Sequence, residues 1–278
     1  MFVKIIGSLA LAALLLPAAE NKAPADKGGV RDNYNIPLWE AGKVPGAKGD
    51  GPLDAPFLTV FLPSAGKANG GSVVIAPGGS NIMLMYGAEG IDIAERYNEW
   101  GVAAFVLTYR LSPRYNEVAR IQDGQRAIRM VRAEAEKFHL DPKRVGYIGF
   151  SAGSNMGRSV VAASGPGDPA AADPVERLSS RPDYLGLVYG PGRATPGENL
   201  KSFPPVFLLS AAGDVGPSLG NAAFTAELIK AGAVVETHIY QKGHHGFGDG
   251  FASGIYSDWM GRLEHFLKQG GFIPGGKE

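Results

Sequence analysis

Residues 145–164 read VGYIGFSAGSNMGRSVVAAS, and this stretch decides the fold. Val145–Gly149 is an apolar run that predicts a buried strand, and the small residues of Ala152–Ser164 predict a helix packed close to a sheet. The turn between them, Gly149–Gly153, fits the pattern G-x-S-x-G. A serine on such a tight strand-to-helix turn points its hydroxyl into open space. The stretch therefore predicts a strand–turn–helix unit with Ser151 as the candidate nucleophile.

Strand-like runs and helix-like spacings alternate on both sides of this unit. The other predicted strands are Leu58–Leu62, Val73–Ala76, Val102–Tyr109, Leu185–Tyr189, Val206–Ser210 and Val234–Tyr240. Helical spacing occurs at residues 91–101, 118–138, 222–231 and 256–268. Alternation with short connections predicts one α/β domain, with a mostly parallel, twisted sheet and helices on both of its faces. Ligand sites in such sheets lie at the carboxyl ends of the strands.

Composition excludes several classes of protein and site. The 278 residues contain 27 Lys+Arg and 27 Asp+Glu, so the net charge is zero and gives no electrostatic case for binding nucleic acid or an anionic membrane. No cysteine is present, which excludes disulfides, thiolate metal sites and a cysteine nucleophile. We assign the α/β domain to residues 57–278 and an extended lead-in, rich in Gly, Pro and Asp, to residues 20–56.

The first 19 residues have the pattern of a secretory signal peptide. Met1–Lys4 is a short positive start, Ile5–Leu16 is apolar, and Pro17-Ala18-Ala19 offers small residues for cleavage. The apolar run is too short to span a bilayer, so we expect a secreted or periplasmic protein without a stable membrane anchor. The alternative is a buried first helix.

The G-x-S-x-G pattern occurs twice, because 40 glycines make chance matches frequent. The second match is Gly216–Gly220, where Ser218 follows a proline and is expected in a loop beyond its strand. Ser151 alone has the strand before it and the helix after it, so we choose Ser151.

A serine nucleophile needs a base and an orienting carboxylate. His244 and His245 lie in a Gly-rich loop after the last predicted strand, and their positions alone do not separate them. Asp214 follows Val206–Ser210 and precedes these histidines, as the acid of such a triad should. An ordinary Asx turn is the alternative role for Asp214. Asp123, on a long helix, is read as a structural or ion-pairing residue.

Pro77-Gly78-Gly79-Ser80 directly follows a predicted strand and is the candidate oxyanion hole. The backbone N–H of Gly79 or Ser80, together with that of Ala152, could bind a tetrahedral oxyanion. A phosphate-binding loop is disfavoured, because neither Gly-Lys-Ser/Thr nor G-x-G-x-x-G is present there. A tight structural turn remains the alternative.

The sequence resembles the small α/β-hydrolase esterases grouped with acetyl-xylan esterases and other xylanase-B-like carbohydrate esterases. The resemblance is carried by Ile36–Trp39, Val73–Gly79, Glu89-Gly90, Gly101–Leu111, Asp123–Ile128, Asp141–Val145, Gly149–Gly153, Phe203–Leu208 and Gly243–Gly248. It implies that the histidine before Gly-Phe-Gly, which is His245, is the base and that Asp214 is the acid. Two departures from the family pattern are Ser80-Asn81 after Pro-Gly-Gly and the segment Val215–Ser218 after the acid.

We therefore expect a secreted serine esterase that hydrolyses short acyl esters, above all acetyl esters, on a small-molecule or polysaccharide carbohydrate substrate. No metal or organic cofactor is expected. The segment Gly190–Phe203 is short and leaves little or no room for a lid. The alternatives are a peptidase or another lipase or esterase of the same fold, and a non-catalytic binding protein on that scaffold.

Overall fold

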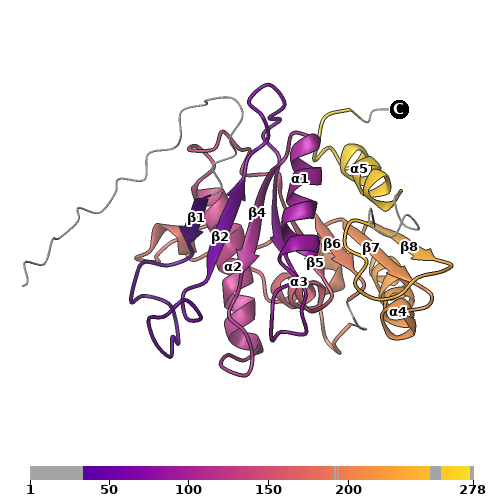
Figure 1. The fold of residues 1–278 in the computed structure, drawn as a ribbon, viewed down its shortest axis with the longest axis horizontal. Coiled ribbons are helices and arrows are strands. Elements are labelled where there is room, and N and C mark those ends of the chain that lie inside the picture. The colour runs from indigo at the N-terminus through magenta and orange to yellow at the C-terminus, as the bar shows by residue number, and fades with distance from the viewer. Residues whose placement is uncertain (1–33, 191, 193, 251–257, 276–278) are drawn as a thin grey trace, which may run out of the picture.

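A computed structural model describes residues 34–190, 192, 194–250 and 258–275. Its eight-stranded sheet has the order β1-β2-β4-β3-β5-β6-β7-β8 (Figure 1). From β4 to β8 every neighbouring pair is parallel, whereas β1 and β2 join antiparallel at one edge. The strands are β1 (Tyr34–Pro37), β2 (Phe57–Phe61), β3 (Ser72–Ala76), β4 (Ala103–Thr108), β5 (Val145–Phe150), β6 (Leu185–Val188), β7 (Val206–Ala211) and β8 (Val235–Tyr240). The predicted α/β class and all seven predicted strands are confirmed.

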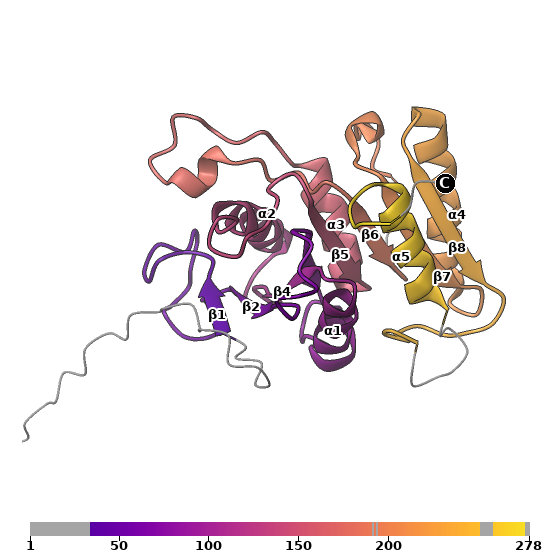
Figure 2. The same cartoon turned by 90° about the horizontal axis from the view of Figure 1, so that it is seen from above.

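Helices cover both faces of the sheet (Figures 1 and 2). On one face α2, α3 and α4 pack against the sheet, and on the other face α1 and α5 do so. The α-helices are α1 (Asp92–Glu99), α2 (Glu117–Ala133), α3 (Ala152–Ala162), α4 (Val215–Ala231) and α5 (Trp259–Gln269). Three short turns complete the described elements: η1 (Gly87–Ile91, a π-helix), η2 (Pro174–Arg177) and η3 (Leu200–Ser202).

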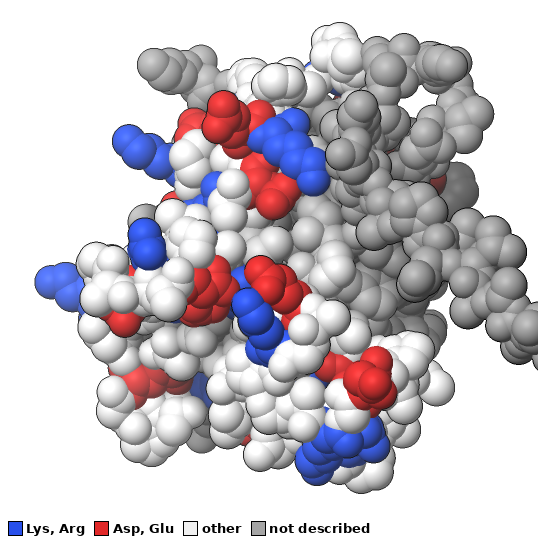
Figure 3. All heavy atoms as spheres, turned by 90° about the vertical axis from the view of Figure 1, so that its left-hand side faces the viewer, with Lys and Arg blue, Asp and Glu red and all other residues white. Residues whose placement is uncertain are grey.

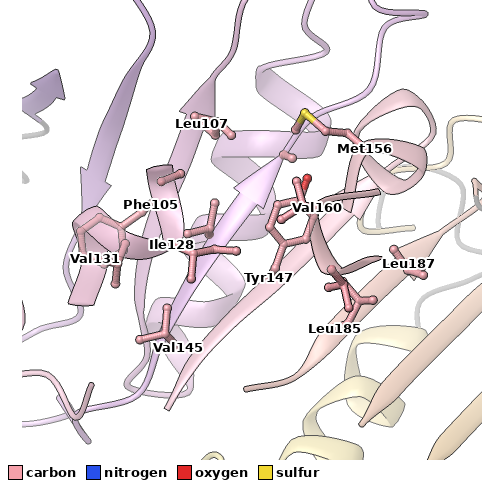
Figure 4. Close-up of a cluster of buried hydrophobic side chains, with 14 of the residues drawn as sticks. Phe105, Leu107, Ile128, Val131, Val145, Tyr147, Met156, Val160, Leu185 and Leu187 are labelled. Atoms are coloured by element: carbon pink, nitrogen blue, oxygen red, sulfur yellow. The ribbon is translucent and has the colours of Figure 1, made fainter. Parts of the chain in front are cut away.

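Two apolar cores result, because successive residues of a strand face opposite sides of the sheet. In the core of Figure 4, Tyr147 of β5 lies among Ile128 of α2 and Met156 and Val160 of α3. The next residue of β5, Ile148, belongs to the core on the other face. Strand β5 is thus buried on both faces, as its continuous apolar run predicts. This burial fixes the end of β5, where the serine turn begins.

Four sequence expectations are changed or left outside the described residues. Strand β1 lies within the expected lead-in and adds an edge strand to the sheet. Its residues Tyr-Asn-Ile-Pro did not predict a strand. The expected loop through Gly220 is wrong, because α4 begins at Val215, directly after Asp214. Ser218 is therefore helical rather than in a loop, and its buried hydroxyl donates a 2.6 Å hydrogen bond to the carbonyl of Ala211. The expected signal peptide, residues 1–19, lies outside the described residues, as does the start of the helix predicted from residue 256.

Charge is distributed without a dominant sign on the face drawn in Figure 3. Basic and acidic side chains lie interspersed on that face, in keeping with the zero net charge of the sequence. No helix in the described part of the chain is long and apolar enough to cross a bilayer.

Candidate active site

Ser151 occupies a sharp turn between the last residue of β5 and the first residue of α3. Its φ of 50° lies in the left-handed region that side-chain-bearing residues rarely adopt. The turn is closely packed: a β-carbon on Gly153 would lie 2.1 Å from the carbonyl oxygen of Ala76, so no side chain fits there. The turn presents Ser151 at the carboxyl edge of the sheet, as the G-x-S-x-G pattern predicts.

His245 lies between the hydroxyl of Ser151 and the carboxylate of Asp214. Its Nδ1 is 2.6 Å from Asp214 Oδ2, and its Nε2 is 2.7 Å from Ser151 Oγ. An ionised carboxylate only accepts hydrogen bonds, so Nδ1–H donates to Asp214. Nε2 of the neutral ring is then free to accept the hydrogen bond from the Ser151 hydroxyl. The arrangement can take a proton from the serine and hold it on the imidazole.

Three different loops bring these side chains together. Ser151 follows β5, Asp214 follows β7, and His245 follows β8. Asp214 is the residue before α4, and its side chain is 14% exposed, whereas that of His245 is 46% exposed. The more covered acid and the more open imidazole leave the histidine accessible to a substrate from solvent.

The other histidines lie away from Ser151 or point elsewhere. His244 Nδ1 is 2.8 Å from the carbonyl oxygen of His245, so this side chain bonds to the loop and not to Ser151. His238 is on β8 and bonds to Glu236. The positions of His244 and His245 alone left the choice open, and the structure brings His245 to Ser151.

The turn after β3 supplies backbone N–H groups beside the serine. Gly79, Ser80 and Asn81 have positive φ values of 124°, 55° and 61°, and the carbonyl of Gly79 accepts from the N–H groups of Ile82 and Met83. The N–H groups of Gly79 and Ser80 themselves have no hydrogen-bond acceptor among the described residues. The N–H of Ala152, in the first turn of α3, has no intrahelical acceptor. We call residues 77–83 the oxyanion turn.

A buried pair of polar side chains behind the site is missing from the sequence-based prediction. Glu89 Oε2 accepts a 2.7 Å hydrogen bond from the N–H of Gly78, and Glu89 Oε1 accepts one of 2.7 Å from the Tyr189 hydroxyl. Burial raises the pKa of Tyr189 far above its usual range, and the neighbouring Glu89 carboxylate adds to this. The only sequence signal was the Glu89-Gly90 pair, which carries the family resemblance but no assigned role.

Asp123 is the structural, ion-pairing residue that the sequence analysis expected. It pairs with Arg110 at 2.7 Å, and both side chains are almost completely buried. Across the described ranges, no cluster of three or more His, Cys, Asp or Glu side chains is arranged to hold a metal ion.

The chain is similar to several known proteins. The BD-FAE family model matches residues 58–165. An acetylxylan esterase of Xylanibacter ruminicola is 28% identical over 242 residues, covering 80% of this chain and 49% of the relative. An endo-1,4-beta-xylanase B of Butyrivibrio fibrisolvens is 25% identical over 66% of this chain and 35% of the relative. The chain thus spans half or less of the length of these curated relatives.

Solved structures extend the similarity over most of the chain. An acetyl ester-xyloside bifunctional hydrolase of Caldicellulosiruptor lactoaceticus superposes with a TM-score of 0.80 at 30% identity, covering 89% of this chain and all of the other. A thermophilic esterase of Thermogutta terrifontis superposes with a TM-score of 0.67 at 20% identity, which supports the fold. These similarities agree with the mostly parallel sheet and with the sharp turn at Ser151. We conclude that the chain belongs to the α/β-hydrolase esterases, in the group with acetylxylan-esterase-like members.

Proposed function

We propose that this protein is a serine esterase that removes short acyl groups, above all acetyl groups, from carbohydrate. The observation that carries the proposal is the position of His245, which lies 2.7 Å from Ser151 Oγ and 2.6 Å from Asp214 Oδ2. An unperturbed serine hydroxyl is a poor nucleophile near neutral pH, and an adjacent oriented imidazole is what activates it.

The first half of the reaction transfers the acyl group to the enzyme. Ser151 Oγ attacks the ester carbonyl carbon while its proton passes to His245 Nε2, and Asp214 stabilises the imidazolium that forms. The carbonyl oxygen becomes an oxyanion, which accepts hydrogen bonds from Ala152 N–H and from Gly79 or Ser80 N–H. The tetrahedral intermediate then collapses, the bond to the alcohol oxygen breaks, and His245 returns the proton to that oxygen.

The second half of the reaction uses water in place of the alcohol. His245 takes a proton from water, the hydroxide oxygen attacks the acyl-enzyme, and the same donors hold the oxyanion. Collapse releases the carboxylic acid and returns the proton to Ser151. Each oxyanion donor is expected to contribute on the order of 10²–10³ in rate. No step requires a metal or an organic cofactor.

Two observations support carbohydrate as the alcohol. The relatives include an acetylxylan esterase and an acetyl ester-xyloside hydrolase. A cavity of about 450 Å³ also lies beyond the carboxyl end of β4. Its lining includes Lys48, Asn116 and Gln122 but no residue of the oxyanion turn. The loop that forms one wall is bonded to the turn, because Ser112 N–H donates to the carbonyl of Asn81 at 2.7 Å. The polar side chains of this cavity suit the hydroxyl groups of a carbohydrate that extends away from the reacting ester.

The test compares hydrolysis of p-nitrophenyl acetate, acetylated xylan and a peptide amide by wild type and Ser151→Ala. We expect acetate release from both esters, no cleavage of the peptide, and a fall in turnover of roughly 10⁶ in the variant. Peptide cleavage would favour the peptidase alternative. Absence of acetate release from either ester, with the protein folded, would favour the binding-protein alternative.

We also propose that the protein is exported, since residues 1–19 have the signal-peptide pattern. Expression of the full chain in a bacterial host with separation of periplasm and cytoplasm tests this. Export predicts a periplasmic product whose N-terminus follows the apolar run. A cytoplasmic product that still begins at Met1 would contradict it.

A further inference from the structure

A chain of three hydrogen bonds runs behind the site from the oxyanion turn to the histidine loop. It starts at the N–H of Gly78, which donates to Glu89 Oε2 at 2.7 Å. The Tyr189 hydroxyl donates to Glu89 Oε1 at 2.7 Å, and the N–H of Gly248 donates to that hydroxyl oxygen at 3.2 Å. Glu89, in η1, is 3% exposed, and Tyr189, which directly follows β6, is fully buried.

Both ends of this chain lie close to the proposed catalytic groups, one in space and the other along the sequence. At one end, Gly78 lies against the nucleophile, because a β-carbon on Gly78 would be 2.8 Å from Ser151 Cβ. At the other end, Gly248 is three residues beyond His245. The Tyr189 ring also packs against the His245 ring, with 4.9 Å between the ring centroids. One carboxylate therefore connects the segment that holds the oxyanion donors to the segment that holds the base.

The chemistry of the pair is unlike that of an ordinary buried ion pair. A buried carboxylate is costly unless it is paired or hydrogen-bonded. No lysine or arginine among the described residues forms an ion pair with Glu89, so hydrogen bonds to Gly78 and Tyr189 compensate its burial. Because a carboxylate accepts at two oxygens set at a fixed angle, it holds two donors at a defined spacing.

We propose that Glu89 and Tyr189 are a positioning pair: they hold the oxyanion turn and the histidine loop at the one separation at which both engage the same tetrahedral intermediate. This inference rests on the proposed esterase function. Neither residue touches the substrate. Glu89 acts through Gly78, which directs the following N–H groups of Gly79 and Ser80, and Tyr189 acts through Gly248 and the ring of His245.

The substitutions that test the pair separate its two halves. Glu89→Gln keeps an oxygen that can accept from Gly78, but its amide cannot accept the Tyr189 proton. Tyr189→Phe keeps the ring against His245 and removes only the hydroxyl. Tyr97→Phe is the matched control, since Tyr97 is a fully buried tyrosine on α1, in the core on the same face of the sheet. A double variant of Glu89 and Tyr189 completes the cycle.

The measurements are kcat and KM for p-nitrophenyl acetate at a temperature where every variant is folded. The concentration of active enzyme is determined by titration with a nitrophenyl phosphate triester, so that kcat refers to active sites only. Each single variant is expected to lower kcat at least about tenfold with little change in KM, which corresponds to the loss of one buried charge-assisted hydrogen bond. The double variant is expected to cost no more than the worse single variant, because the two residues act as one unit. Tyr97→Phe is expected to keep the wild-type kcat.

A second measurement separates positioning from mere stability. Phenylboronic acid adds to Ser151 Oγ and mimics the tetrahedral intermediate, so its inhibition constant is expected to rise by the same factor by which kcat/KM falls. Lowered melting temperatures with unchanged kcat and unchanged boronate inhibition would overturn the proposal and make the pair purely structural. Additive losses in the double variant would also overturn it. A wild type that hydrolyses no ester would instead overturn the proposed function.

Discussion

Gly213 and Gly243 lie so close that a β-carbon on Gly213 would be 2.0 Å from the carbonyl oxygen of Gly243. Gly213 directly precedes Asp214, and Gly243 lies two residues before His245. The loops after β7 and β8 thus meet backbone to backbone, and this contact sets the distance between the acid and the histidine. The absence of a side chain at residue 213 is a requirement of the site.

Gly213→Ala is therefore expected to displace the histidine loop and lower kcat by roughly 10², the cost typical of a 1 Å misplacement. Gly216→Ala is the matched control, because a β-carbon there meets nothing within 4 Å. Initial rates on p-nitrophenyl acetate check the pair of variants. Equal rates for the two would show that the loop contact does not position His245.

The two adjacent histidines are expected to behave very differently. His245→Ala removes the proposed base and should lower kcat by roughly 10⁶, whereas His244→Ala loses only a bond to the carbonyl of residue 245 and should keep kcat near wild type. Steady-state kinetics on the same substrate distinguish them. Near-normal turnover by His245→Ala would transfer the role to His244.

The buried Arg110–Asp123 pair is expected to control stability. Asp123 accepts hydrogen bonds from the N–H, Nε and Nη2 of Arg110. Asp123→Ala would leave a buried guanidinium without its counter-charge, a change that costs about 3–5 kcal/mol of unfolding free energy. Urea unfolding followed by circular dichroism measures this, with the exposed Glu136→Ala as control. A loss below about 1 kcal/mol would mean that Arg110 finds another partner.

The Asp54–Arg114 pair is expected to give stability a pH dependence in acid. Hydrogen bonds from Arg114 and from the Tyr115 hydroxyl lower the pKa of Asp54 from 3.8 to about 2. A carboxyl whose pKa is lower in the folded state stabilises the fold above its unfolded pKa, and this stabilisation disappears as the pH falls towards the folded value.

The measurable consequence is a difference in melting temperature between wild type and Asp54→Asn that is constant above about pH 5 and vanishes towards pH 2. The exposed Asp50→Asn serves as control and should show no such difference. A difference that persists unchanged at pH 2 would contradict the assignment to Asp54.

Most of the sheet was predictable because parallel strands buried on both faces leave continuous apolar runs, as at Val73–Ala76 and Val206–Ser210. Strand β1 has no such run: it is short, partly exposed, lies at an edge and ends in proline. The start of α4 was missed because Gly216 and Pro217 suggest a loop. Proline is, however, compatible with the first turn of a helix, where its missing N–H has no partner to lose.

The chemistry-bearing residues divide along similar lines. Ser151 and Asp214 each follow a recognisable strand, so chain order and loop position were enough to name them. Loop position narrowed the base to His244 or His245, and only the family resemblance pointed to His245. Glu89 and Tyr189 are 100 residues apart and meet only in the folded chain. From the sequence alone, a glutamate on a short helix is expected to face solvent, because its buried partner Tyr189 is not apparent. Such long-range polar contacts leave no periodic signal in a sequence.

The order of the strands makes the histidine the most easily lost member of the site. Strand β8 is the last in the described sheet, pairs only with β7, and contains no buried residue. Edge segments with little burial open at lower free energy than the interior strands. On warming, β8 can therefore fray and carry His245 away while the buried β5 still holds Ser151 in place. Inactivation is expected to begin at temperatures below the main unfolding transition and to reverse on cooling. The edge strand would then limit the temperature range of activity while most of the fold is still intact.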